Sequence, residues 1–250
     1  MKPLVRWTIG PVNGCGMEIL EESVKQFGRI YPEFDRVVCY NQIPISDLPE
    51  FETEVVLYEQ SSGDLAYPLM GYDDPLINVD AQLRKYGMAG SGWKLCPPRL
   101  RIDTHELWLD NDIVIWERIP QINEWLVSQK NIISEGRGRI FGQFSHLVPS
   151  HLKLCAGFFG LHNGFDFNFA ILEHCKLLHG GALGHYDEQG LVSAIISNSS
   201  HIVVPQTELR IVQHNEILPP VRPPAIHFVG ANRHSHPAWH TYKISKIKLL

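Results

Sequence analysis

The first 41 residues alternate strand, helix and strand, and this order constrains the fold more than any other feature of the chain. Leu4 to Ile9 is a short apolar run that ends in a loop rich in glycine and proline. Apolar residues recur at helical spacing from Met17 to Tyr31, and Arg36 to Asn41 has the pattern of a second strand. A βαβ unit of this length predicts a parallel sheet whose ligand site lies at the carboxyl ends of the strands.

The residues at these strand ends are candidates for a ligand pocket: Thr8, Gly10, Tyr40 and Asn41. The loop from Gly10 to Gly16 lacks the order G-x-G-x-x-G, and no acidic residue follows at the distance typical of a dinucleotide site. It also lacks the G-x-G-T-R-L expected of a sugar nucleotidyltransferase here. A Rossmann cofactor site is therefore disfavoured.

Length and composition fit one α/β domain, with room for a subdomain, because 250 residues with 44% hydrophobic content can bury a full core. The net charge is -5 and the 22 Lys and Arg residues are scattered, which argues against a nucleic-acid-binding surface. No apolar run is long enough to span a membrane, so we expect a soluble protein. The five cysteines lie among apolar neighbours without metal spacing, which favours reduced core thiols in a cytoplasmic protein.

Further along the chain, the patterns predict the remaining elements. Apolar runs predict strands at 55–58, 154–161, 201–204 and 225–229, and a strand from Leu107 that ends at Asp110 and Asp112. Helical periodicity predicts helices at 121–129, 165–178 and 188–197, the second with Phe165, Phe169, Leu172 and Leu177 as its apolar stripe. The segment from Ile43 to Gly92 is irregular and rich in proline, which is typical of a loop-rich insertion that serves as a substrate flap or as scaffold.

Two aspartates interrupt the apolar run from Leu107 to Ile115. Asp110 and Asp112 are separated by one residue at the point where the run of strand length ends. Paired carboxylates of this kind suit Mg²⁺ or Mn²⁺, which take oxygen ligands and keep open positions for phosphate. A polar junction between strand and turn explains the tripeptide equally well, since Asp and Asn favour turns.

A histidine on the last predicted strand supplies the second half of such a site. His227 lies within the apolar segment from Ala225 to Val229 and is followed by Gly230 and Arg233. A glycine frees backbone N–H groups, and an arginine suits phosphate oxygens. Taken alone, a histidine on an apolar strand is more often a hydrogen-bonded core residue.

In these motifs the chain resembles the GT-A superfamily of nucleotide-sugar-dependent glycosyltransferases, especially the branch with glycogenin and the bacterial lipopolysaccharide galactosyl- and glucosyltransferases. That branch carries D-x-D, an upstream R-L pair, N-x-G, D-Q and a terminal H-x-x-G-x-x-K. The resemblance implies that Asp110, Asp112 and His227 hold Mn²⁺ or Mg²⁺. It also implies donor contacts from Asn111, Gly230, Asn232 and Arg233, where Arg233 replaces the lysine.

Three further segments match the family motifs imperfectly. Lys94 and Leu95 stand at the R-L pair, which makes Lys94 a donor-binding candidate with Arg99 as its competitor. Cys155-Ala156-Gly157 stands at the N-x-G motif, so Gly157 is kept as a donor contact although the amide is replaced by a thiol. Asp187-Glu188-Gln189 resembles the D-Q region under the transferred sugar, with an inserted acidic residue; these three are the catalytic candidates, and Asp187 equally suits a helix N-cap.

The resemblance implies a mostly parallel, twisted central sheet flanked by helices, in a single GT-A-like domain over residues 1–250. Residues 1–115 would be the nucleotide-sugar-binding half, and residues 116–250 the acceptor-side half with the C-terminal metal and diphosphate motif. The implied activity is metal-dependent transfer of a sugar from a nucleoside-diphosphate sugar, a UDP-sugar above others, to a hydroxyl of a glycan, a lipid-linked glycan or a protein. In an inverting reaction Asp187 or Glu188 could act as general base; in a retaining one they would only stabilise the sugar.

Two other functions remain open. The same fold could serve as a non-catalytic nucleotide-sugar or glycan-binding module. A D-x-D phosphatase with Asp110 as nucleophile is less favoured, because its aspartates normally follow the first strand and precede a threonine. His234, His236 and His240 could add a transition-metal site, but a solvated histidine-rich loop is the simpler interpretation.

Overall fold

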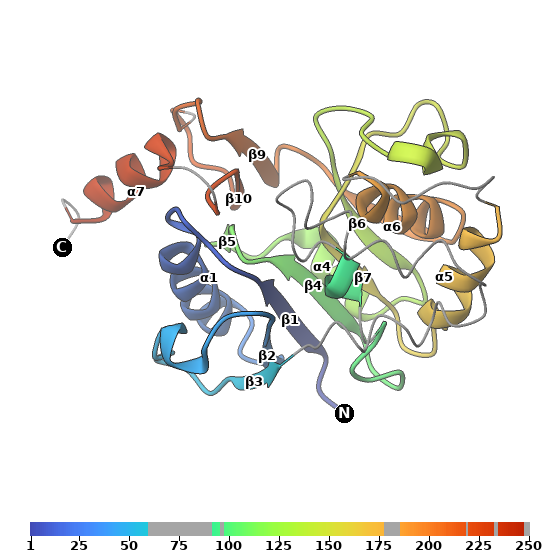
Figure 1. Cartoon of the computed structure of the whole chain (residues 1–250), viewed down its shortest axis with the longest axis horizontal. Coiled ribbons are helices and arrows are strands. Elements are labelled where there is room, and N and C mark those ends of the chain that lie inside the picture. The colour runs from blue at the N-terminus through green and yellow to red at the C-terminus, as the bar shows by residue number, and fades with distance from the viewer. Residues whose placement is uncertain (60–91, 96–97, 178–185, 219, 233–234, 248–250) are drawn as a thin grey trace.

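The structure is a computed structural model that describes residues 1–59, 92–95, 98–177, 186–218, 220–232 and 235–247 (Figure 1). Its centre is a seven-stranded sheet in the order β3-β2-β1-β4-β7-β6-β8. These strands are β1 (Leu4–Ile9), β2 (Asp35–Tyr40), β3 (Val56–Glu59), β4 (Glu106–Asp110), β6 (Asn131–Glu135), β7 (Leu154–Leu161) and β8 (His201–Val204). The sheet is mostly parallel, as predicted, because only β7 runs antiparallel to its two neighbours.

Helices cover both faces of this sheet. On one face, α1 (Gly16–Ile30) and α4 (Pro120–Leu126) pack in a core that includes Leu107 and Leu109 of β4. On the other face, α5 (Phe167–Cys175) and α6 (Asp187–Ser197) pack in a core that includes Trp108. Successive β4 side chains point to opposite faces, and both faces are buried, which explains why Leu107, Trp108 and Leu109 are all apolar.

A smaller sheet of β5 (Ile113–Ile115), β10 (Ala225–Val229) and β9 (Leu209–Gln213) lies beyond the carboxyl end of β4. β10 is antiparallel to β5 and parallel to β9. The C-terminal helix α7 (Pro237–Ile247) packs beside this sheet through Trp239, which also donates to Glu18 of α1. The chain therefore returns at its C-terminal end to the edge at which β1 and β4 end.

Several predicted elements differ from the observed ones. β4 ends at Asp110, as predicted, but the residues after the turn at Asn111 and Asp112 form β5 in a different sheet, which was not predicted. β6, β9 and α7 were not predicted. Most of the segment from Ile43 to Gly92 lies outside the described residues, although it contains β3 and the 3₁₀ helices η1 (Ile45–Asp47) and, at its end, η3 (Gly92–Leu95).

The histidine-rich segment is not a solvated loop throughout. His236 is fully buried, with Nε2 3.3 Å from the Val212 carbonyl oxygen. His240 is exposed, and its Nε2 lies 2.9 Å from the Ser235 hydroxyl oxygen. His234 is outside the described residues. The interpretation as a solvated loop was therefore wrong for His236.

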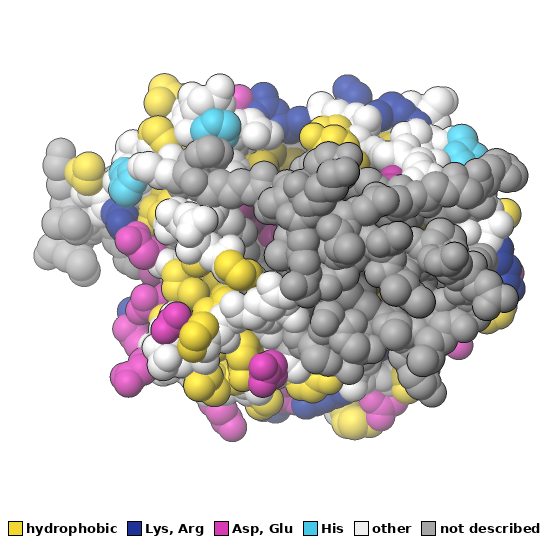
Figure 2. Space-filling model, viewed as in Figure 1, with side chains coloured by type: hydrophobic (Ala, Val, Ile, Leu, Met, Phe, Trp, Pro, Cys, Tyr) yellow, Lys and Arg dark blue, Asp and Glu magenta, His cyan; other side chains and the backbone are white. Residues whose placement is uncertain are grey.

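On the face drawn in Figure 2, acidic side chains gather at the side of the molecule where α1 and β3 lie, and Lys and Arg occur in separate small groups. The α1 glutamates Glu18, Glu21 and Glu22 contribute to the negative charge of that helix. No helix among the described residues is long and apolar enough to span a membrane.

Candidate functional site

Asp110 and Asp112 flank the turn that leaves the central sheet. Asp110 is the last residue of β4 and pairs in register with Thr8 of β1, whereas Asp112 directly precedes β5. The buried residues before and after the turn hold both strand ends in place, and they leave the Asp110 carboxylate partly exposed while Asp112 is buried. The sequence pattern thus places two carboxylates at the carboxyl edge of the parallel strands.

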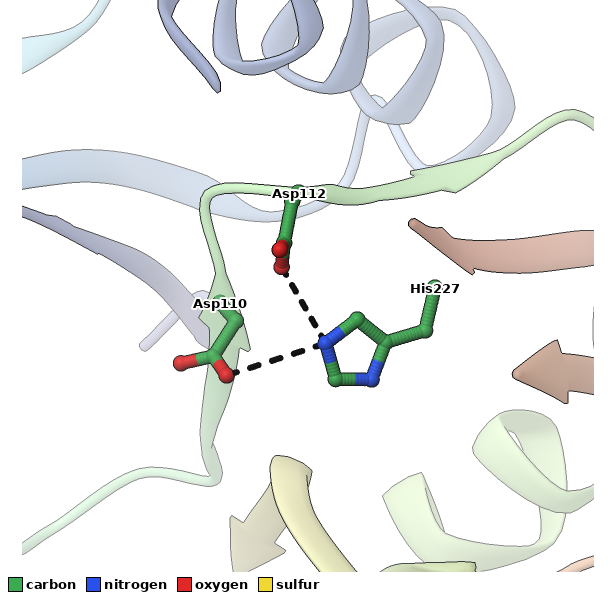
Figure 3. Close-up of side chains that lie close together, drawn as sticks. All are labelled: Asp110, Asp112 and His227. Carbon is green, nitrogen blue, oxygen red and sulfur yellow. Dashed lines mark ion pairs between the residues drawn. The ribbon is translucent and has the colours of Figure 1, made fainter. Parts of the chain in front are cut away.

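His227 reaches the same point from β10. It pairs in register with Ile113, and the Phe228 amide donates to the Asp112 carbonyl oxygen at 2.8 Å. Its Nε2 lies 3.1 Å from Asp112 Oδ1 and 3.8 Å from Asp110 Oδ2, and Figure 3 shows the imidazole facing both carboxylates. One ligand atom of each residue lies within 4.8 Å of the other two. The predicted convergence of the three side chains is confirmed.

These residues fit a divalent cation. Asp112 Oδ1 is buried and faces His227 Nε2, an ion pair that exists only while the imidazole is protonated, so a cation bound there would take the place of that proton. Two carboxylates and one imidazole are the donor types that divalent metals take in proteins. Burial opposes protonation of His227, but the charge of Asp112 holds the pKa of the imidazole well above its usual range, so a metal would displace a proton there.

Lys94 adds a cation to the cluster. Its Nζ donates to Asp110 Oδ1 at 2.7 Å, and the Lys94 carbonyl accepts from Arg6 Nη2 at 3.0 Å, which anchors η3 against the sheet. Burial opposes the charged ammonium, but Asp110 and Glu188 together hold the pKa of Lys94 above its ordinary value. Burial likewise opposes ionisation of Asp110, yet Lys94 and His227 hold its pKa below the ordinary value. Both groups therefore stay charged.

A cleft of about 400 Å³ opens onto this cluster. The charged residues Lys94, Asp110, Asp112, Glu188 and His227 all line it. Polar or small lining residues also come from β7, from α6 and its N-cap, from β9 and from the loop after β6; they include Cys155, Gly157, Tyr186, Gln189, Gln213 and Arg137. A smaller cavity beside it is lined by Thr8, Lys94 and Asp110, so the end of β1 also borders the site.

Gly157 lies where a side chain would collide with the cluster. A Cβ atom there would be 2.5 Å from His227 Cε1 and 2.9 Å from Asp110 Oδ2. Cys155 approaches the same ring, with Sγ 3.8 Å from His227 Nδ1. The register between β6 and β7 shifts at Ser134, so that Ala156 and Gly157 belong to the irregular part of β7. This irregular part of β7 therefore lies against the imidazole.

The three catalytic candidates on α6 have different surroundings. The Asp187 carboxylate is buried and accepts from Gln143, through its backbone N at 2.6 Å and its Nε2 at 3.2 Å. Tyr186, not Asp187, occupies the N-cap position of α6, so the N-cap interpretation was wrong. Glu188 and Gln189 line the cleft. Burial raises the pKa of Glu188 to about 7; the charge of Lys94 opposes this shift and the charge of Asp110 adds to it.

The other predicted donor contacts divide into two groups. Tyr40 and Asn41 are buried at the end of β2. The backbone N–H of Asn41 donates to the backbone carbonyl of Ile9, the residue before Gly10. Arg99 lies elsewhere: its guanidinium donates to the carbonyls of His162 and Phe165 and faces Glu106 at the opposite end of β4. Between Lys94 and Arg99, only Lys94 reaches the cluster.

The remaining candidates belong to the turn and to the C-terminal motif. Asn111 and Asn232 exchange side-chain hydrogen bonds of 2.7 and 3.0 Å. Gly230 has φ of 95°, a conformation that favours glycine, and it ends the segment that carries His227. Arg233 lies outside the described residues.

Comparison with solved structures identifies the architecture. The galactosyltransferase LgtC, in complex with donor and acceptor sugar analogues, superimposes with a TM-score of 0.60 over 98% of this chain and 94% of its own, at 10% identity. Mouse xyloside xylosyltransferase 1 gives 0.52 over 92% and 98%, at 10% identity. The glycosyltransferase GlyE of Streptococcus pneumoniae gives 0.51 over 92% of this chain and 55% of its own, at 12% identity.

The chain has the GT-A glycosyltransferase fold. The sequence itself matches no protein-family model and no curated protein. At this level of identity, the GT-A likeness establishes the fold alone, and the chemistry of the site has to be argued from its own residues.

Sequence reasoning missed some residues of the cleft. Arg137, Tyr186 and Gln213 line it, and none was a candidate. The Gly-Arg-Gly-Arg turn at 136–139 was a usable signal for Arg137, whereas Gln213 lies on a strand that was not predicted. Cys155 was noticed only as a replacement for an amide, and its contact with His227 could not be inferred from the sequence.

Proposed function

We propose that the chain is a metal-dependent glycosyltransferase that moves a sugar from a nucleoside-diphosphate sugar to an acceptor hydroxyl. The observation that carries this proposal is the grouping of Asp110, Asp112 and His227 in a cleft at the carboxyl edge of a GT-A sheet. We favour a UDP-sugar as donor, a glycan, lipid-linked glycan or protein as acceptor, and the cytoplasm as location. In this scheme residues 1–115 bind the nucleotide sugar and residues 116–250 supply the acceptor side.

Asp110, Asp112 and His227 would hold Mn²⁺ or Mg²⁺. A divalent cation bound there neutralises charge on the leaving nucleoside diphosphate. We favour Mn²⁺, because Mg²⁺ demands a near-ideal shell of oxygen ligands and His227 offers a nitrogen.

Lys94 and Arg233 would support the same leaving group as cations. Asp110 binds the Lys94 ammonium, and Arg6 binds the Lys94 backbone carbonyl. These two contacts hold the ammonium in the lining of the cleft. Gly157 and Gly230 would allow the donor to approach the backbone closely. Thr8, Gly10, Tyr40 and Asn41 would line the nucleobase and ribose, because they cluster where β1 and β2 end.

Glu188 is the carboxylate that we expect to face the acceptor. Asp187 is engaged with Gln143, whereas Glu188 lines the cleft together with Lys94 and Gln189. A pKa raised to about 7 suits a group that must take a proton near neutral pH, which is the role of a general base in an inverting reaction. In a retaining reaction, Glu188 and Gln189 would instead stabilise the positive charge that develops on the sugar.

A thermal-shift screen of nucleoside diphosphates and nucleotide sugars, with and without Mn²⁺, tests the donor site, because a ligand of the native state raises the melting temperature. We expect a Mn²⁺-dependent shift with a uridine diphosphate and release of that diphosphate from its sugar conjugate. Asp110→Ala or Asp112→Ala should abolish both effects, whereas Asp47→Ala, on the exposed turn η1, should not. Unaffected turnover in the first two variants would contradict the metal role.

The binding screen and the turnover assay together separate the alternatives. Donor binding without turnover would identify a non-catalytic module; two features of the site favour that function, the replacement of an amide by Cys155 and the Lys94–Asp110 ion pair. Turnover of a simple aryl phosphate would instead favour a phosphatase, although the GT-A architecture gives that function no support.

A further inference from the structure

We infer that Asn111 and Asn232 form a clamp that positions the metal ligands, and that they act through those ligands and not through the donor. This inference rests on the proposed metal-dependent function. It reassigns two residues whose place in the sequence motifs suggested donor contacts, and it explains how segments 121 residues apart are held in register.

The clamp is a reciprocal pair of amide hydrogen bonds. Asn111 Nδ2 donates to Asn232 Oδ1 at 2.7 Å, and Asn232 Nδ2 donates to Asn111 Oδ1 at 3.0 Å. The second hydrogen of Asn111 Nδ2 goes to the Gly16 carbonyl at 3.1 Å. Because an asparagine amide has two N–H donors, Asn111 has none left for a nucleotide or a sugar.

Each partner is adjacent to a metal-ligand segment. Asn111 is the residue between Asp110 and Asp112 at the end of β4, and Asn232 follows β10, the strand that carries His227. The backbone joins the same two segments, since Phe228 N donates to the Asp112 carbonyl oxygen. A shift of Asn232 relative to Asn111 would therefore change the distance between the imidazole and the two carboxylates.

The first turn of α1 closes the clamp from a third side. A Cβ atom at Gly16 would lie 1.9 Å from Asn232 Oδ1 and 3.0 Å from Asn111 Nδ2. The loop before α1 also holds the segment that carries Asn232, because the backbone N–H of Asn13 donates to the backbone carbonyl oxygen of Asn232 at 2.9 Å. Gly16 is thus needed for close approach and not for an unusual backbone angle.

The test is direct binding of Mn²⁺ to the full chain without nucleotide, followed by the electron paramagnetic resonance signal of free Mn²⁺. We expect Asn111→Ala and Asn232→Ala each to weaken Mn²⁺ binding by about 10- to 100-fold, the range seen when groups that orient metal ligands are removed. The double variant should bind no more weakly than the weaker single variant, because either change alone opens the clamp.

Gly16→Ala gives a variant that keeps both amides. Alanine favours a helix over glycine, so a purely structural role would leave Mn²⁺ binding unchanged. A clamp predicts weaker binding, by about 10-fold or more, because the new methyl group displaces Asn232. Gly28→Ala is the matched control on the same helix: its Cβ would meet only the ends of the Thr53 and Arg36 side chains, at 3.2 and 3.3 Å.

Asn131→Ala is the control for loss of a buried asparagine. Asn131 is fully buried and makes two side-chain hydrogen bonds, to the Ser199 hydroxyl and from the His162 amide, within the central sheet region. We expect it to lower the melting temperature and to leave the Mn²⁺ dissociation constant within about twofold of wild type, since mutations at sites without shared partners act independently.

The outcomes are distinct. If wild type binds Mn²⁺ and the Asn111, Asn232 and Gly16 variants bind it equally well, the clamp is overturned and the proposed function survives. Additive losses in the double variant would also overturn it. If wild type binds Mn²⁺ no better than Asp112→Asn, the metal site itself is absent, and both proposals fail together.

Discussion

The two ends of β4 carry carboxylates in opposite situations. Glu106, at the start of the strand, is fully buried and faces Arg6 and Arg99 at 3.6 and 3.8 Å. Its oxygens also accept backbone N–H groups from Leu100 and Arg101 at 3.0 to 3.2 Å. Every charge at this end has a partner supplied by the chain.

Just beyond the carboxyl end of β4 the carboxylate has a different kind of partner. The buried Asp112 Oδ1 faces His227 Nε2 at 3.1 Å, and this is an ion pair only while the imidazole is protonated. A carboxylate held by guanidinium groups, which keep their protons, suggests a structural role, whereas one paired with an imidazole can exchange that proton for a metal ion. The contrast between Glu106 and Asp112 therefore separates stability from function at the two ends of β4.

Asp112→Asn should have the largest effect on activity. The change removes a negative ligand from the metal site with little change in volume, and we expect metal-dependent turnover to fall by about 10³-fold, the scale of losing one electrostatic group in an active site. The free energy of unfolding should change little, because His227 can release its proton when Asp112 becomes neutral. Steady-state assays and urea unfolding check the two expectations; retained turnover would contradict the functional role of this end.

Glu106→Gln should have the opposite result. Two buried guanidinium groups lose their counter-ion, which costs about 3–5 kcal/mol when a buried pair is broken. Mn²⁺ should still raise the melting temperature of this variant, because the change lies at the other end of the strand. A fall in unfolding free energy of less than about 1 kcal/mol would show that the Glu106 network is solvated in solution.

The sequence predicted the central strands because they are apolar on both faces. β1, β4, β8 and β10 fall within about two residues of the predicted runs. The grouping of Asp110 with Thr8 follows from parallel strands ending at one edge. The approach of His227 does not follow from any pattern, because β10 belongs to a separate sheet; the family resemblance supplied it.

The failures have local causes. The apolar stripe predicted for the helix at 165–178 included Phe169 and Leu177, which are exposed, whereas Phe167 and Ile171 of α5 are buried, because a largely apolar helix gives no reliable face. The hydrogen bonds of Asp187 to Gln143 and the contact of Lys94 with Asp110 join segments far apart in sequence. Contacts of this kind depend on packing, which a single sequence does not encode in any short window.

Two glycines of β7 sharpen the comparison of site and core. Gly157→Ala places a methyl group against His227 Cε1 and Asp110 Oδ2, so we expect Mn²⁺ binding to weaken by about 10- to 100-fold. Gly160→Ala instead meets Ile132 and Trp125 in the core, each at 2.8 Å, and should cost about 1–3 kcal/mol of stability while Mn²⁺ binding is kept. Equal loss of Mn²⁺ binding in both variants would indicate a general distortion of the strand.

Glu188→Gln tests the raised pKa of about 7 by pH. In the unfolded chain this glutamate ionises near its ordinary pKa, whereas in the native state it ionises only near pH 7. The stability that Glu188 contributes is therefore fully present below its ordinary pKa and is lost as the pH rises from that value through about 7. In metal-free protein the glutamine variant should match wild type at about pH 4 and be more stable at about pH 8. Urea unfolding at both pH values checks this; a constant difference would rule out the shift.

Cys155→Ala should have the smallest effect. The Sγ–Nδ1 distance of 3.8 Å makes the thiol a weak acceptor for the imidazole N–H, so its loss should reduce Mn²⁺ affinity by only about two- to fivefold. Cys175→Ala, buried in the core between α5 and α6, is the matched control and should lower stability alone. If Cys155→Ala weakened binding as much as Gly157→Ala, the thiol and not the close backbone would set the orientation of His227.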